Sequence, residues 1–110
     1  MSSIILQQHL YKIRKEIITQ INLTIKEICS ISKKNEVELT QSMLVAHNNE
    51  THLIHRVSIE EGCVNCIDEQ YREILCFKSI SNQNLIDILY NLELILKNIK
   101  VERNKNVLTQ

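Results

Sequence analysis

The first third of the chain carries apolar side chains at a helical spacing over almost its whole length. Between residues 4 and 31 a stripe recurs every three or four positions, at Leu6, Leu10, Ile13, Ile17, Ile21, Thr24, Ile28 and Ile31, with Thr24 as its one polar member. This spacing predicts one amphipathic helix, and neighbouring apolar residues widen its stripe enough to contact two other elements. Such a helix would measure about 42 Å at 1.5 Å per residue. That length favours an elongated bundle or a surface that pairs with another chain.

A second amphipathic segment is predicted near the other end of the chain, from Asn82 to Val101. Its apolar residues follow a heptad-like spacing at Leu85, Ile88, Leu89, Leu92, Ile95, Leu96 and Ile99. Ser81 or Asn82 is a suitable N-cap. We expect this narrower stripe to be covered within the monomer, and the polar tail from Glu102 to fray.

The middle of the chain has a less decisive pattern. Val64 to Ser79 is predicted to form a third helix, and two interpretations compete between Glu36 and Glu61. A patchy helical stripe is favoured there. The alternative is a strand in which every second residue from Val37 to Val45 shares a face, followed by a turn at Asn48–Asn49 and a second strand from Leu53 to Ile59.

The near absence of glycine and proline favours the helical interpretation. The chain has no proline and one glycine, Gly62, and tight turns normally use both residues. We therefore predict an all-α fold, a single domain over residues 1–110 built as an antiparallel bundle of four or five helices. The alternative is an α+β fold with a small antiparallel hairpin or meander between the terminal helices. The helices would meet near Lys33–Asn35, Asn48–Asn49, Gly62 and Ser81–Asn82.

The charge balance limits the partners that this chain can have. Thirteen basic and thirteen acidic residues cancel, which disfavours nucleic acid as a partner because nucleic-acid binders usually carry a basic excess. The N-terminus lacks the apolar core of a signal peptide, and no apolar run approaches the roughly 20 residues that cross a bilayer. We expect a cytoplasmic protein without a membrane partner, whose four cysteines are reduced.

One cluster of residue types suits a metal ion. His52, His55, Cys63 and Cys66 follow the pattern H-x2-H-x7-C-x2-C, and four nitrogen and sulfur ligands are what tetrahedral zinc requires. The two pairs could meet only if the chain reverses between them, which Gly62 would permit. Ordinary packing of the cysteines and solvation of the histidines is favoured. A zinc-stabilised regulatory domain, associated with nucleic acid, is the alternative.

Catalytic motifs are missing from the sequence. It has no glycine-rich phosphate loop, no H-E-x-x-H and no G-x-S-x-G, so we expect neither an enzyme nor a cofactor. The favoured function is a non-enzymatic helical interaction protein, such as a small regulator, a chaperone or an immunity-type protein. It would bind a protein partner or itself, as a homodimer, through an amphipathic helix face. The candidate partner-binding residues are Leu6, Leu10, Ile13, Ile17, Ile21 and Ile28.

Overall fold

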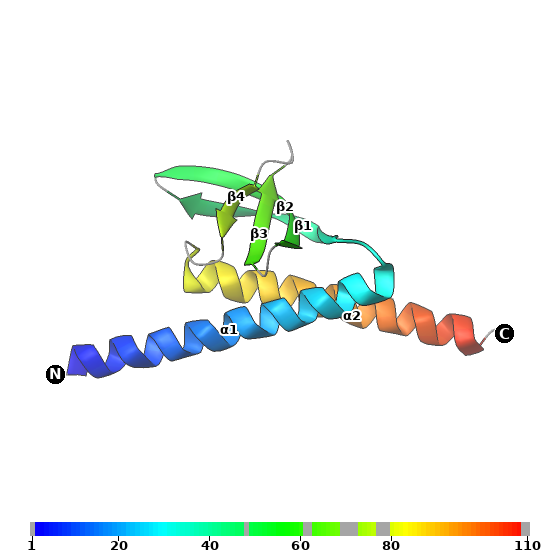
Figure 1. The fold of residues 1–110 in the computed structure, drawn as a ribbon, viewed down its shortest axis with the longest axis horizontal. Helices are drawn as coiled ribbons and strands as arrows, with labels where there is room; N and C mark the ends of the chain where they lie inside the picture. Colours follow the sequence, from blue (N-terminus) through cyan, green and yellow to red (C-terminus); the bar gives the residue numbers. More distant parts are fainter. Residues whose placement is uncertain (1, 48, 61–62, 69–72, 77–79, 109–110) are drawn as a thin grey trace.

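The computed structural model shows two long helices that carry a four-stranded antiparallel sheet on one side (Figure 1). It describes residues 2–47, 49–60, 63–68, 73–76 and 80–108. The elements follow in the order α1 (Ser2–Ser32), β1 (Glu36–His47), β2 (Glu50–Glu60), β3 (Cys63–Asp68), β4 (Glu73–Cys76) and α2 (Asn82–Leu108). Each strand pairs with the next one along the chain, so the sheet is a meander in the order β1-β2-β3-β4.

The predicted all-α bundle is therefore wrong, and the alternative α+β fold is the one that the structure shows. The helix favoured between Glu36 and Glu61 is replaced by β1 and β2. The helix predicted from Val64 to Ser79 is replaced by β3 and β4 over its described residues, and its remaining positions, 69–72 and 77–79, lie outside them. Alternation decided the first case, because Val37, Leu39, Met43 and Val45 are all buried on the side of the sheet that faces the helices. Packing against α1 and α2 overrides the local preference for helix.

Both terminal helices form where their apolar spacing predicts them. The segment predicted from Ile4 to Ile31 lies inside α1, and the segment predicted from Asn82 to Val101 begins α2. α2 continues to Leu108, past the point at Glu102 where the polar composition suggests fraying. Each helix is thus longer than the stripe that predicted it.

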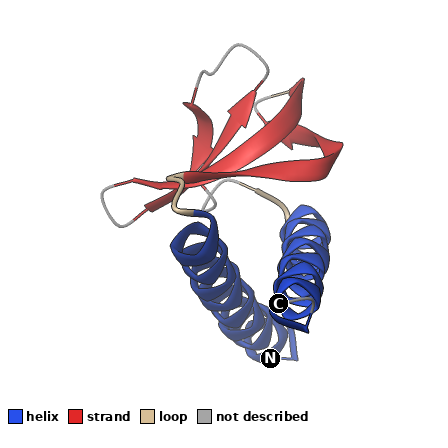
Figure 2. Ribbon diagram, turned by 90° about the vertical axis from the view of Figure 1, so that its right-hand side faces the viewer, coloured by secondary structure: helices blue, strands red, loops and turns tan. Residues whose placement is uncertain are grey.

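The two helices run in the same direction along the long axis of the molecule (Figure 1). Arg14 Nη1 donates a hydrogen bond of 2.8 Å to Asn82 Oδ1, and Lys100 Nζ lies 2.9 Å from Glu27 Oε1. The two contacts occur in the same order along both helices, which contradicts the predicted antiparallel packing. Both helices lie on one face of the sheet (Figure 2), and the molecule extends 61 × 33 × 25 Å.

The apolar core lies where the helix pair meets the sheet. α1 and α2 contribute Ile21, Ile25, Ile28, Leu85, Ile88 and Leu92, and the strands contribute Val37, Leu39, Met43, Val45, Ile54 and Val57. Thr24 is the polar residue of α1 within this buried face, and its hydroxyl donates to the Gln20 carbonyl at 2.7 Å. The core thus occupies the C-terminal half of α1 and leaves its N-terminal half outside.

Left-handed residues mark two of the predicted joints. Lys33 follows α1 with φ of 59°, and its amide donates to the Cys29 carbonyl at 2.8 Å, which is the hydrogen bond of an αL helix cap. Asn49 lies between β1 and β2 with φ of 62°. Asparagine tolerates this conformation, whereas a lysine there is strained by its Cβ.

Replacing a core isoleucine of α1 is expected to destabilise the fold, whereas replacing one near its N-terminus is not. Ile25→Ala removes a fully buried side chain and should lower the free energy of unfolding by about 2–4 kcal/mol. Ile5→Ala is the matched control, because the Ile5 side chain is 68% exposed and its loss should change stability by less than about 0.5 kcal/mol. Urea titration followed by circular dichroism measures both. Equal losses would contradict the position of the core.

Relieving the strained helix cap is expected to stabilise the protein. Lys33→Gly places a residue without a Cβ at a left-handed position and should raise the free energy of unfolding by about 1 kcal/mol. The control is Lys34→Gly, which adds glycine where φ is not positive and should leave stability unchanged or lower. Thermal unfolding of the two variants and the parent compares them directly. An increase in both variants would rule out this explanation.

Candidate protein-binding surface

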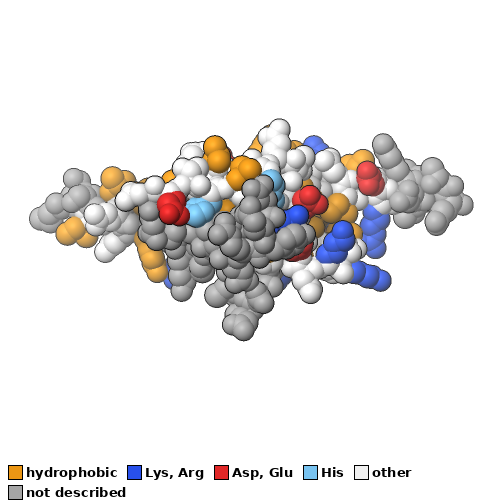
Figure 3. Space-filling view, turned by 90° about the horizontal axis from the view of Figure 1, so that it is seen from above, with side chains coloured by type: hydrophobic (Ala, Val, Ile, Leu, Met, Phe, Trp, Pro, Cys, Tyr) orange, Lys and Arg blue, Asp and Glu red, His pale blue; other side chains and the backbone are white. Residues whose placement is uncertain are grey.

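The N-terminal part of α1 exposes apolar side chains to solvent, and we call residues Ile4–Tyr11 the arm. The exposed fractions are 60% for Ile4, 68% for Ile5, 57% for Leu6, 43% for Leu10 and 64% for Tyr11. The arm extends beyond the sheet and beyond the start of α2 (Figure 1). Seen from the sheet side, apolar side chains reach the surface at this end of the molecule (Figure 3). A contiguous apolar surface of this kind is typical of a protein-binding site.

The base of the arm is fixed to the body by polar contacts. Arg14 bonds to Asn82 at the first residue of α2, so the two helices come together at this level. Lys15 Nζ lies 5.5 Å from the centre of the Tyr11 ring, within the range of a cation–π contact. Lys12 and Lys15 are both exposed. The apolar surface of the arm is therefore followed along α1 by a group of basic side chains, Lys12, Arg14 and Lys15.

The six predicted partner-binding residues fall into three environments. Leu6 and Leu10 are exposed on the arm, Ile13 and Ile17 are half-buried at its base, and the last two, Ile21 and Ile28, are buried in the core. The stripe is continuous along one helix face, but only its N-terminal part is available to a partner. The sequence pattern could not show where the monomer stops covering the stripe.

The outer side of α2 carries a second exposed apolar stripe. It consists of Ile86, Tyr90, Leu94 and Val101, with exposed fractions of 46%, 63%, 40% and 45%. We call these four residues the outer stripe. Their spacing of four, four and seven positions is visible in the sequence. The stronger stripe through Leu85, Ile88 and Leu92 hid it, because that stripe alone accounts for an amphipathic helix.

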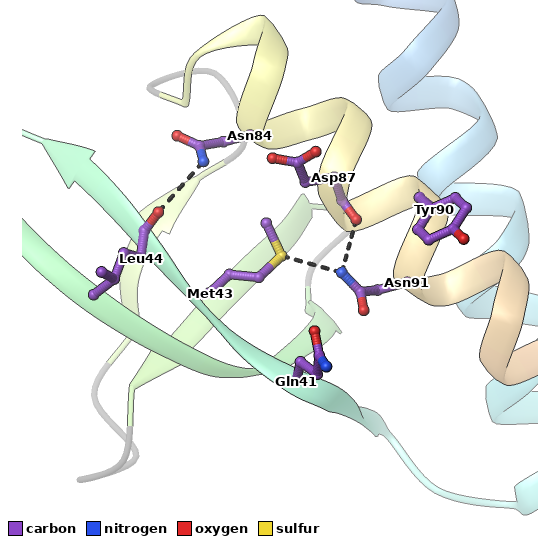
Figure 4. Close-up of a pocket in the computed structure, with 7 residues that line it drawn as sticks. All are labelled: Gln41, Met43, Leu44, Asn84, Asp87, Tyr90 and Asn91. Carbon is purple, nitrogen blue, oxygen red and sulfur yellow. Dashed lines mark hydrogen bonds between the residues drawn. The ribbon is translucent and has the colours of Figure 1, made fainter.

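A groove of about 350 Å³ lies between β1 and α2 (Figure 4). It is lined by Gln41, Met43, Leu44, Asn84, Asp87, Tyr90 and Asn91. Asn84 Nδ2 donates to the Leu44 carbonyl at 3.4 Å, and Asn91 Nδ2 donates to the Asp87 carbonyl at 2.9 Å and lies 3.6 Å from Met43 Sδ. The polar groups of this groove are three amide side chains, one carboxylate and the phenol of Tyr90. The contacts of Asn84 and Asn91 fix β1 on α2.

The backbone register separates the residues of the predicted zinc site. His52 lies near the start of β2, whereas Cys63 of β3 pairs with Glu60 at the end of β2. Eight residues of extended strand separate these levels, which is about 26 Å at 3.3 Å per residue. Zinc bonds measure about 2.0–2.3 Å, so this arrangement does not bring the four residues together. The side chains of Cys63 and Cys66 lie outside the described residues. Among the side chains that are described, no group of three His, Cys, Asp or Glu could hold a metal ion.

His55 lies at an irregularity of the sheet. The register between β1 and β2 shifts between Glu38 and Met43 of β1. The register between β2 and β3 shifts between Ile54 and Arg56, the two residues that flank His55. A hydrogen bond of 2.7 Å joins Ser42 Oγ to His55 Nδ1. A nucleophilic serine also needs oxyanion donors and a cavity for its substrate, and Ser42 does not line the groove beside β1. We interpret this bond as a contact that holds the bulged strands together.

The remaining candidate groups lie at the end of α1. Burial raises the pKa of the Cys29 thiol, which disfavours the thiolate that a reactive cysteine needs. Lys26, Lys33 and Lys34 line a shallow pocket beside it. Lys33 and Lys34 directly follow the C-terminus of α1, where basic side chains are stabilised by the helix dipole.

Two comparisons gave negative results: the helices with the requirements of a membrane span, and the chain with known proteins. Neither α1 nor α2, over its described residues, is apolar enough over a sufficient length to span a bilayer. No protein-family model, no curated protein and no solved structure matches this chain.

Proposed function

We propose that this chain is a non-enzymatic interaction protein that binds another protein through the arm of α1. The observation that carries the proposal is the exposure of Ile4, Ile5 and Leu6, three consecutive apolar residues in the N-terminal part of α1. Exposed apolar surface costs free energy in water, about 25 cal/mol per Å². A partner that covers the arm would recover this free energy.

The arrangement of the three residues favours a groove as the binding surface of the partner. Successive helix residues are rotated by about 100°, so Ile4, Ile5 and Leu6 point to different sides of α1. A flat surface would cover one side and leave the others in water. Apolar residues that point to several sides of one helical turn are all covered only by a surface that surrounds that turn. The partner therefore encloses the arm at Ile4–Leu6, whereas farther along it contacts the side that carries Leu6 and Leu10 and not the side of Gln8.

The charges at the base of the arm favour a partner with an acidic rim. Lys12, Arg14 and Lys15 lie close together, with Glu16 as the one carboxylate between residues 4 and 16. Opposite charges around an apolar contact guide association and select the partner. The arm of a second copy, packed against this one, would instead bring further basic groups. The proposed partner thus presents an apolar groove bordered by Asp and Glu.

Photo-crosslinking in the cells that produce the protein tests this proposal. A photo-reactive phenylalanine analogue replaces Leu10 in one version of the full chain and Gln8, which is exposed on the polar side of the arm, in another. We expect one adduct of defined mass from position 10 and at least about fivefold less from position 8, because the partner contacts the apolar side. Denaturing electrophoresis and mass spectrometry measure the yield and identify the captured peptide.

A further substitution makes the experiment specific for the arm. Adding Leu6→Glu to the chain with the analogue at position 10 should abolish the adduct, while the melting curve stays unchanged because Leu6 is exposed. The captured peptide should combine apolar residues with Asp and Glu. Equal yields from positions 8 and 10 would disprove the proposal. So would an adduct made of two copies of this chain.

A further inference from the structure

We propose that the C-terminal end of α1 binds a small soluble compound that carries two linked phosphate groups. The site is the shallow pocket of about 410 Å³ at the point where the chain leaves α1 for β1 (Figure 1). It is lined by Lys26, Cys29, Ser30, Lys33, Lys34 and Asn35. The arm lies at the opposite end of α1, so this proposal goes beyond the binding of a protein partner and does not depend on it.

The pocket forms because the chain turns back beside the last turns of α1. Lys26, Ser30 and Lys33 lie four and three positions apart, so they follow one another along one face of the helix. At Lys33 the backbone takes the left-handed conformation, with φ of 59°, which ends the helix. Lys34 and Asn35 then line the same pocket as the residues of the helix face.

The pocket is positively charged. Its described lining includes three ammonium groups and no carboxylate. The acidic residues next to it in the sequence have other partners, since Glu27 Oε1 lies 2.9 Å from Lys100 Nζ and Glu36 Oε1 lies 3.7 Å from Arg56 Nε. The dipole of α1 adds about half an elementary negative charge at this end, which the three lysines exceed. The resulting positive potential attracts an anion.

The lining groups match linked phosphates in charge, chemistry and size. An ammonium group binds phosphate as a point charge, and the Ser30 hydroxyl and the Asn35 amide are donors for its oxygens. A single phosphate ester carries about 1.5–2 negative charges at pH 7, so two linked phosphates balance three lysines better than one does. The volume of the pocket lies in the range of about 300–1,000 Å³ that is typical of small-molecule sites.

The surroundings of the pocket favour a soluble compound over a membrane or a nucleic acid. Residues 24–43 are all described, and none of them exposes a large apolar side chain. Basic surfaces that bind a membrane usually insert such side chains. A nucleic acid requires a longer basic surface, whereas the pocket is flanked along the chain by Glu27 and Glu36.

The backbone conformation of Lys33 is a second observation that supports the site. Its Cβ makes the left-handed conformation unfavourable, and glycine is the residue that suits this position best. Strained residues of this kind cluster at ligand-binding sites. A glycine would relieve the strain but would remove one of the three ammonium groups from the pocket.

Titration of the isotope-labelled full chain with inorganic pyrophosphate, followed by NMR, tests the proposal. We expect the backbone amide signals of Ser30, Lys33 and Lys34 to shift most and to saturate with a Kd below about 1 mM at low salt. Sodium chloride at about 0.5 M should weaken binding at least about fivefold, because it screens exposed charges. Orthophosphate should bind more weakly than pyrophosphate, because it carries less charge.

Two substitutions of Lys33 separate the loss of charge from any loss of folding. Lys33→Gln removes the ammonium group and keeps the strained Cβ, whereas Lys33→Gly removes both. Each should weaken pyrophosphate binding at least about fivefold, and Lys33→Gly alone should raise the melting temperature. Weaker binding by a more stable protein cannot result from unfolding. The matched control is Lys12→Gln, which removes an exposed charge at the other end of α1 and should change binding less than about twofold.

A second measurement distinguishes a soluble ligand from a lipid headgroup. Phosphatidylcholine vesicles that contain about 5% of a phosphatidylinositol bisphosphate should leave the chain in the supernatant after centrifugation. Sedimentation with these vesicles would overturn the assignment of a soluble ligand.

Two results would overturn the site itself. One is the absence of saturable shifts at Ser30, Lys33 and Lys34 up to about 10 mM pyrophosphate, and the other is equal weakening by Lys12→Gln and Lys33→Gln. Leu6→Glu should leave pyrophosphate binding unchanged. The arm proposal can therefore fail in the crosslinking experiment while the phosphate site survives, and the reverse also holds.

Discussion

The contact of α1 with α2 under the sheet is the constraint on which the remaining structure depends. Ile21 and Ile25 of α1 and Leu85 and Ile88 of α2 are buried in one layer, and the inner face of β1 and β2 closes over them. A sheet with one apolar face is not stable without a cover. Each side chain buried in this way contributes about 1.5–3 kcal/mol relative to an exposed one. Removing either helix would therefore expose the sheet, and removing the sheet would expose both helices.

The helices could be predicted from the sequence because their apolar period is long and uninterrupted. α1 and α2 begin and end within a few residues of the stripes that predict them, apart from the extension of α2 to Leu108. The parallel orientation of α1 and α2 could not be predicted, because it depends on the point at which the last strand of the sheet ends and α2 begins. The contacts of Arg14 with Asn82 and of Lys100 with Glu27 join residues that no local pattern relates.

The strands were harder to predict because two rules conflicted. The alternation from Val37 to Val45 indicates a strand, whereas the lack of proline and the single glycine argue against hairpins. The structure resolves the conflict by placing Asn49 in the left-handed conformation between β1 and β2, a position that asparagine can occupy in place of glycine. The low glycine and proline content therefore gave too strong an argument against hairpins.

The candidate site was predicted in part. The stripe from Leu6 to Ile28 indicated the correct helix, but its burial increases steadily toward the core, and only a three-dimensional arrangement reveals which end is covered. The outer stripe at Tyr90 and Leu94 was missed, since a helix with one strong apolar face appears complete. A weaker apolar stripe on a helix can be recognised as exposed surface only once the structure shows that the stronger stripe fills the core.

The order of the elements has a consequence for synthesis of the protein. α1 is made first and its main helical partner α2 last, with about 50 residues of strands and connections between them. At a ribosomal rate of about 5–20 residues per second, the apolar face around Ile21 and Ile25 waits roughly 3–10 s before α2 begins to emerge. During that interval only the strands can cover the apolar face of α1, and the part of that face that packs on α2 stays exposed. The chain is therefore most exposed to aggregation, and to capture by chaperones, before its last quarter has been translated.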